Sequence, residues 1–170
     1  KTIARQSYVG RLFLYIKDLD SNFVWSNTFA PMNRQPDKYE IVFASDKIKY
    51  IRKDGDITTK SEIIVTTDHH AEVRKITFKN ESSEVKKLEL TTYTEVILSE
   101  NMDDVSHRAF NSMFISTAYD DESHALIAKR KTRGDDNVNN YMFNRLVIPG
   151  VEDGYSYATE RAHFIGRNHT

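Results

Sequence analysis

The chain has 170 residues, and its 24 Lys and Arg residues nearly balance 25 Asp and Glu residues, giving a formal net charge of −1. This balance argues against a protein that binds nucleic acid or an anionic membrane, because binding a polyanion requires a strongly positive surface. Hydrophobic residues make up 39% and charged residues 29% of the chain, a composition typical of globular domains. The absence of cysteine excludes a disulfide scaffold, a thiolate zinc site and thiol catalysis.

A chain of this length accommodates one hydrophobic core, so we expect a single domain over residues 1–170. No apolar run approaches the ~18 residues of a membrane span. The chain begins with Lys1 rather than methionine, and we interpret it as a fragment of a larger enzyme.

Apolar and polar residues alternate with a period of two along most of the chain, which is typical of β-strands with one buried face. In residues 85–98, for example, Leu88 and Leu90 share one side with Val96 and Leu98. The strands expected in the first part of the chain are 10–16, 39–44, 47–53, 57–66, 71–79 and 85–98. Further runs, each with β-branched or aromatic residues, predict strands at 110–119, 124–131, 141–148 and 155–165.

Short polar links separate these strands. Asp54-Gly55 is typical of a two-residue hairpin turn, since this pair tolerates positive φ angles. The five strands between residues 39 and 98 therefore predict an antiparallel meander. The whole pattern predicts an all-β fold: a large antiparallel β-sandwich of about ten strands with little helix.

Two stretches lack the strand pattern. Residues 18–38 contain two of the prolines and the single tryptophan, Trp25, and residues 99–111 form the second irregular stretch. We expect 99–111 to be a loop, and a loop of this length between strong strands is a candidate for function.

Carboxylates and histidine gather around that second stretch, at Glu95, Glu100, Asp103, Asp104 and His107. These residue types serve general acid and base catalysis or metal binding. Placed in an open loop, they are more typical of solvated side chains, so no catalytic residue, metal site or cofactor is predicted. His69 and His70 are adjacent at a turn, where consecutive side chains diverge, and a solvated turn is the favoured interpretation.

The basic run 129–133 and the aromatic residues are the remaining candidates. In a strand, the members of the basic run alternate between the two faces, which argues against a nucleic-acid patch. Exposed aromatic rings on a sandwich could stack on sugar rings, because the apolar faces of pyranoses match flat aromatic surfaces. The candidates for sugar stacking are Trp25 and Tyr93, with Phe13 and Tyr15 on the first strand; the alternative is packing against a neighbouring element.

Several strings of residues, in order along nearly the whole chain, resemble the N-terminal β-domain of glycoside hydrolase family 94, formerly glycosyltransferase family 36. The resemblance is closest to the cyclic β-1,2-glucan synthase group. Arg108 stands where the family has a proline, Glu160 where it has an aspartate and Asn168 where it has a glycine. The strings are LYIKDLD at 14–20, VWS at 24–26, YEIVF at 39–43, TTYTEVIL at 91–98, HRAF at 107–110, ALIAKRK at 125–131 and TERAHFIGR at 159–167.

The resemblance implies a supersandwich fold similar to galactose mutarotase, joined in the family to an (α/α)₆ barrel that carries the general acid and the phosphate-binding residues. No catalytic residue can therefore be transferred to this chain. The family also implies that the loop at 99–111 extends toward the active-site mouth of a partner subunit. The residues expected to contact carbohydrate or the interface are Asp103, Asp104, His107, Arg108 and Asn111. The alternative is that His107 and Phe110 only anchor the loop.

The leading hypothesis is a non-catalytic N-terminal module of a sugar phosphorylase or cyclic β-1,2-glucan synthase-type enzyme, inactive alone. Its expected partners are the helical barrel of the same parent chain, a β-linked glucan and a second copy in a homodimer. The expected location is the cytoplasm or the cytoplasmic face of a membrane. The alternatives are an independent carbohydrate-binding module and a purely structural or dimerisation sandwich.

Overall fold

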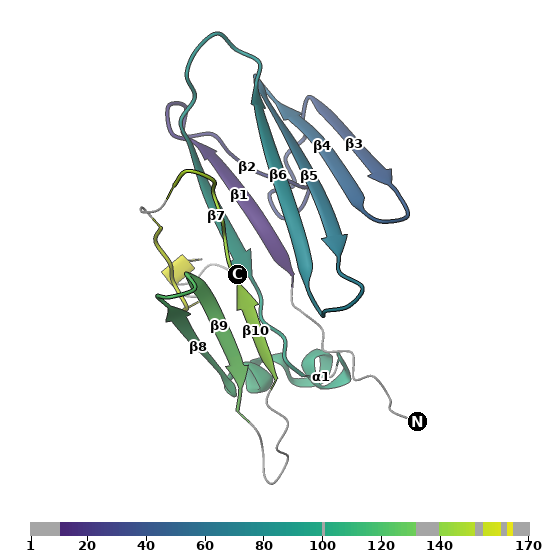
Figure 1. Cartoon of the computed structure of the whole chain (residues 1–170), viewed down its shortest axis with the longest axis vertical. Helices are drawn as coiled ribbons and strands as arrows, with labels where there is room; N and C mark the ends of the chain where they lie inside the picture. Colours follow the sequence, from purple (N-terminus) through teal and green to yellow (C-terminus); the bar gives the residue numbers. More distant parts are fainter. Residues whose placement is uncertain (1–10, 100, 132–139, 152–154, 161–162, 165–170) are drawn as a thin grey trace. The chain divides into compact units, whose positions relative to one another are not determined.

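The computed structural model describes residues 11–99, 101–131, 140–151, 155–160 and 163–164, excluding the side chains of 101–105 and 108. These residues form ten strands and one helix (Figure 1). The all-β fold with about ten strands and little helix is thus confirmed. The elements are β1 (Leu12–Asp18), β2 (Val24–Ser26), β3 (Lys38–Phe43), β4 (Ile48–Asp54), β5 (Ile57–Val65), β6 (Glu72–Asn80), β7 (Leu88–Thr94), α1 (Asn101–Ser112), β8 (Ile115–Asp120), β9 (Ala125–Arg130) and β10 (Tyr141–Asn144).

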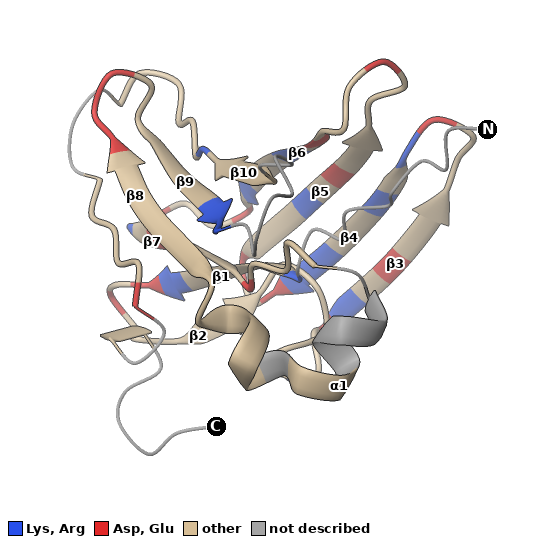
Figure 2. Cartoon of the chain, turned by 90° about the horizontal axis from the view of Figure 1, so that it is seen from below, with Lys and Arg blue, Asp and Glu red and all other residues tan. Residues whose placement is uncertain are grey.

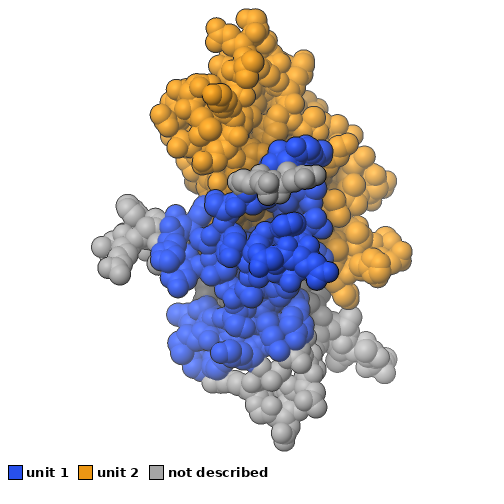
Figure 3. Space-filling model, turned by 60° about the vertical axis from the view of Figure 1, so that its left-hand side comes forward, with its two compact units in different colours: residues 1–11, 94–170 blue, residues 12–93 orange. Residues whose placement is uncertain are grey.

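The chain divides into two compact units, coloured separately in Figure 3. One unit is Leu12–Tyr93, and the other combines Lys1–Arg11 with Thr94–Thr170. Each unit is described by itself below. The assignment of the whole chain to one domain stays a prediction.

The Leu12–Tyr93 unit is a two-layer sandwich. One layer has the strand order β2-β1-β7, and the other has the order β3-β4-β5-β6. The core between them is built from alternate residues of the strands, as the period of two requires. Its buried members are Leu14, Ile16, Trp25 and Ile57, with Ile76, Phe78, Leu88 and Leu90 packed against them.

The predicted five-stranded meander is correct for four strands and wrong for the fifth. Strands β3 to β6 pair in sequence order, each antiparallel to the next. Strand β7 instead joins β1 in the other layer. Its Leu88 and Leu90 pack on the same core as Leu14 and Ile16 of β1, so burial of these side chains decides its position.

Several boundaries differ from the sequence prediction. The link between β4 and β5 is the expected tight turn, and Gly55 adopts a φ of 57° there. Residues 95–98, predicted as the end of a strand, follow β7 and form no strand. Residues 110–112, predicted as the start of a strand, are helical, and 155–160 form no strand. Residues 161, 162 and 165 of that last predicted strand lie outside the described part. The short β2 was missed because its three residues are too few to show alternation.

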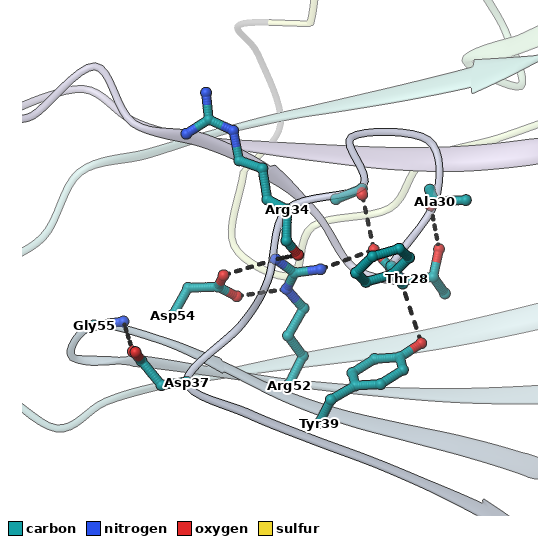
Figure 4. A network of polar contacts seen from close by, with 10 residues as sticks. Thr28, Ala30, Arg34, Asp37, Tyr39, Arg52, Asp54 and Gly55 are labelled. Carbon is teal, nitrogen blue, oxygen red and sulfur yellow. Dashed lines mark hydrogen bonds and ion pairs between the residues drawn. The ribbon is translucent and has the colours of Figure 1, made fainter.

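A buried ion pair fixes the connection between β2 and β3 to the sheet (Figure 4). Arg52 is 0% exposed and forms a bidentate pair with Asp54 of the same strand. The guanidinium also donates to the carbonyl oxygens of Thr28 (3.0 Å) and Arg34 (3.1 Å). A buried charge is tolerated only when it is paired and hydrogen-bonded, so this arrangement fixes the backbone at Thr28 and Arg34 to the sheet.

In the second unit, the antiparallel sheet has the order β10-β9-β8, and α1 precedes it in the chain. Ala125 and Ala128 of β9 are buried. Backbone hydrogen bonds extend the sheet at the ends of β9: the amide of Lys131 donates to the carbonyl oxygen of Phe114 (2.8 Å), and the amide of Arg130 donates to that of Asn140 (3.0 Å). Residues from both ends of the β9–β10 connection are thereby fixed to the sheet.

Candidate functional site

The stretch expected to be a loop at 99–111 is mostly helix, so this part of the prediction is wrong. Helix α1 spans Asn101–Ser112. Asp103 and Asp104 fall in its first turn, where negative charge is favourable because the helix dipole is positive at that end. Met102, Val105 and Ala109 repeat at helical spacing. This signal was present in the sequence and was masked by the interpretation of the carboxylates as loop residues.

Helix α1 is kinked at His107. Its φ of −145° and ψ of 51° lie outside the helical region and divide α1 into two helical segments. The side chain of His107 is exposed, so it does not anchor the segment to the sheet. The side chains of Asp103, Asp104 and Arg108 lie outside the described part, as does Glu100; the backbone places the first three on α1.

Asn111, the last of the predicted site residues, is fixed to the sheet. It is 8% exposed, and its Oδ1 accepts a hydrogen bond of 2.9 Å from the guanidinium of Arg130 on β9. The same guanidinium lies over the ring of Phe114, 5.8 Å from the centroid. Arg130 therefore joins the end of α1 to β9, and Asn111 serves as a structural contact there.

Phe110 is 42% exposed, although the sequence suggested that it could anchor the segment at the start of a strand. Its ring meets the ring of Phe114 edge to face, with centroids 5.1 Å apart. Edge-to-face pairs are a favourable aromatic geometry. Phe110 thus contributes a ring contact to the end of α1 while remaining partly exposed.

The two predicted sugar-stacking residues have different surroundings. Trp25 is 1% exposed and packs against Phe23, with ring centroids 5.7 Å apart. The expectation that it is an exposed aromatic is wrong, because its alternation on β2 directs it into the core beside Ile16. Tyr93 is half-buried and stacks on Phe13 at 6.4 Å with an interplanar angle of 10°.

The sequence analysis did not single out two exposed aromatic residues on β10. Tyr141 is 58% and Phe143 is 71% exposed, and they share one face of the strand because they are two residues apart. The register places Lys129 beside Tyr141 and Ile127 beside Phe143. The ammonium of Lys129 lies 5.2 Å from the Tyr141 ring centroid. The sequence predicted a strand over 141–148, but it did not predict that these two rings are exposed.

The carboxylate at the far end of the same sheet face is Asp120. The hydroxyl and the amide of Ser123 donate to it, and these hydrogen bonds hold the pKa of Asp120 below its ordinary value. An ionised carboxylate, a lysine and two aromatic rings thus border this face of β8, β9 and β10.

The other chemical candidates are dispersed over the described residues. Glu95 is half-buried, and His69 and His70 are exposed in the turn between β5 and β6. Within the described ranges, no three His, Asp or Glu side chains lie close enough to hold a metal ion. In the same part of the chain, no helix has the length and apolar character needed to cross a bilayer.

Comparison with known proteins agrees with the resemblance seen in the sequence strings. The family model described as glycosyl hydrolase 94, supersandwich domain, matches residues 9–170. The chain belongs to this family. The chain is also similar to the cyclic beta-(1,2)-glucan synthase NdvB of Rhizobium meliloti (strain 1021), with 30% identity over 162 residues. That match covers 93% of this chain but 6% of NdvB, so the chain corresponds to a small part of that relative.

Proposed function

We propose that this supersandwich domain is a non-catalytic module of a larger sugar phosphorylase or cyclic β-1,2-glucan synthase-type enzyme. The observation that supports this function is the match of residues 9–170 to the glycosyl hydrolase 94 supersandwich, together with the 6% coverage of NdvB. In the proposal, the partner is a helical catalytic barrel of the same parent chain, the substrate is a β-linked glucan, and the enzyme works in the cytoplasm or at the cytoplasmic face of a membrane as a homodimer.

Helix α1 is the segment that we propose to border the active site of the parent enzyme. Its end is fixed through Asn111 and Arg130, while the side chain of His107, at the kink, is exposed. A guanidinium is a strong donor to sugar hydroxyls or to phosphate. Arg108, next to the kink, is therefore the residue assigned to substrate contact in this proposal.

The test uses the full-length parent enzyme. Arg108→Ala should raise the KM for the acceptor sugar roughly ten- to a hundredfold, because losing a charged hydrogen-bond donor costs about 1.5–3 kcal/mol. Arg145→Ala, which removes an exposed arginine after β10, is the matched control and should leave KM unchanged. Unchanged kinetics of Arg108→Ala together with a lower melting temperature would assign α1 a structural role instead.

The inactivity of the isolated chain is tested separately. Incubated with phosphate and β-glucan oligomers, the 170-residue chain should release no glucose 1-phosphate, because the family resemblance assigns the chemistry to the barrel. Turnover by the chain that is lost in Glu95→Gln or Asp104→Asn would overturn this part of the proposal.

A second candidate function is an independent carbohydrate-binding module, favoured by the exposed rings of Tyr141 and Phe143. Calorimetric titration of the chain with β-1,2-gluco-oligosaccharides tests it. Dissociation constants below about 1 mM, lost in Phe143→Ala but kept in Phe164→Ala, would support sugar binding at this face. Absence of binding combined with dimer formation would favour a structural or dimerisation domain.

A further inference from the structure

The four-stranded sheet of the Leu12–Tyr93 unit has a lysine-rich outer face. Arg52, Asp54, Thr59 and Ser61 are buried and mark its inner face, so the alternate residues point outward. The charges on the outward positions are six lysines and two glutamates: Lys38, Lys49, Lys53, Lys60, Lys75, Lys79, Glu40 and Glu62. We call these six lysines the lysine face. Figure 2 marks basic positions in blue along β4, β5 and β6.

The strand register concentrates the positive charge further. Lys38 pairs with Lys53, Lys53 with Thr58, and Thr58 with Lys79. This row across the sheet therefore has three lysines and no carboxylate. Like charges that lie directly opposite on neighbouring strands destabilise a sheet, so these lysines depend on carboxylates outside the row for compensation.

The nearby carboxylates are shared among several lysines. Glu62 lies 3.6 Å from Lys47, 3.8 Å from Lys49 and 3.2 Å from Lys60. Glu81, which directly follows β6, pairs with Lys53 and Lys79. Two carboxylates thus pair with five ammonium groups, and three of these lysines, Lys53, Lys60 and Lys79, are more than a third exposed. Excess positive charge remains accessible to solvent.

Aliphatic side chains occupy one end of the same face. Ile64 and Val73 pair across β5 and β6 and are 37% and 54% exposed. The β5–β6 hairpin therefore carries exposed aliphatic groups beside the lysines, a combination that suits the boundary between lipid headgroups and acyl chains.

We propose that the lysine face docks onto an anionic lipid surface, with the β5–β6 hairpin at the headgroup boundary. Lysine is depleted at protein–protein interfaces, which disfavours an acidic protein as the occupant. The outward positions of β3 to β6 include no arginine and no aromatic residue, although arginine forks and stacked rings are the usual contacts to nucleic acid. Lysines near an anionic membrane act as point charges that are attracted to its lipid headgroups. This inference is independent of the proposed enzymatic role.

Sedimentation of the 170-residue chain with lipid vesicles tests the proposal. The chain should bind equimolar phosphatidylglycerol and phosphatidylcholine vesicles, and should not bind vesicles of phosphatidylcholine alone. The triple variant Lys60→Gln, Lys75→Gln, Lys79→Gln should lower the partition coefficient on the order of a hundredfold. The matched control Lys17→Gln, Lys86→Gln, Lys87→Gln changes the net charge equally away from this face and should retain binding. Added salt should weaken binding by screening.

Three results would overturn the proposal. The first is no binding of the wild-type chain to the anionic vesicles, and the second is an equal loss in both triple variants. The third is tighter binding to polyglutamate or to a single-stranded oligonucleotide than to the vesicles, because the occupant would then be a protein or a nucleic acid. Circular dichroism of both variants shows that any loss occurs in folded protein.

Discussion

Arg52 and Asp54 lie two residues apart on β4 and form a bidentate ion pair within the sandwich unit. The Nε of Arg52 donates to Oδ2 of Asp54 at 2.6 Å, and its Nη2 donates to Oδ1 at 2.8 Å. The side chains are 0% and 3% exposed. The spacing of two residues directs both side chains to the same interior face, so one strand supplies both the buried charge and its partner.

Removing one member of this pair should be strongly destabilising. Asp54→Ala leaves the Arg52 guanidinium buried without its counterion and should lower the free energy of unfolding by about 3–5 kcal/mol, measured by urea denaturation. The double variant Arg52→Met, Asp54→Leu removes both charges and should be more stable than Asp54→Ala. The control Glu40→Ala breaks an exposed pair with Lys38 at 4.0 Å and should change stability by less than about 0.5 kcal/mol.

The single tryptophan reports directly on the core. Because Trp25 is 1% exposed, its fluorescence emission should be blue-shifted, and acrylamide should quench it poorly in the folded chain. Trp25→Ala should destabilise the chain by roughly 3–5 kcal/mol, since it removes a large buried side chain. Emission typical of solvated indole in the folded protein would contradict the burial of Trp25.

Glu81 should titrate far below an ordinary glutamate. Hydrogen bonds from Lys53 and Lys79 lower the pKa of Glu81 from 4.5 to about 2. Because this folded-state pKa lies below the unfolded value, the stabilisation is complete above about pH 4.5 and is lost as the pH falls toward 2. Carboxyl titration by NMR should give the low pKa in the wild-type chain, and Lys53→Met should move the pKa of Glu81 upward. An unchanged pKa in that variant would contradict the role of Lys53.

The hydrogen bond between Arg130 and Asn111 should control the order of α1. Arg130→Met removes a charged donor and should destabilise the end of the helix by about 1.5–3 kcal/mol. Amide hydrogen exchange at Phe110 to Phe114 should then become faster than in the wild-type chain. Lys129→Met, which alters the neighbouring residue on the opposite face of β9, is the matched control. Equal acceleration of exchange in both variants would show that the bond does not hold α1.

The alternation of residues in the sequence was sufficient to predict most strands and the all-β class. Alternation with a period of two is a local property of the sequence, so it identifies strands. Strands β3 to β6 pair in sequence order because the short turns between them bring consecutive strands side by side. The pattern failed where neighbours in space are distant in sequence. Strand β7 pairs with β1 because Leu88 and Leu90 complete a core begun by Leu14 and Ile16, and no local pattern encodes that choice.

The candidate site was likewise predicted from the sequence only in part. The family strings identified the glycosyl hydrolase 94 supersandwich correctly, but the loop assigned to 99–111 proved to be α1, and the tryptophan expected at the surface is in the core. Exposure depends on which face of an element is covered by another element. A sequence gives the faces of each strand without saying which face is covered, so Tyr141 and Phe143 were also missed.

Composition alone determined that the chain is globular, lacks thiol chemistry and has a net charge of −1, and the last fact argued against any anionic surface as a partner. Only the tertiary structure decided which of these charged residues are exposed and which lie side by side. The register of β3 to β6 aligns lysines from four strands on one outer face, while Arg52 and Asp54 of the same sheet are buried together. Electrostatic attraction to a surface depends on the local charge within about a Debye length, and not on the sum over the chain. A nearly neutral sequence can therefore present a basic face once strand pairing has separated its charges.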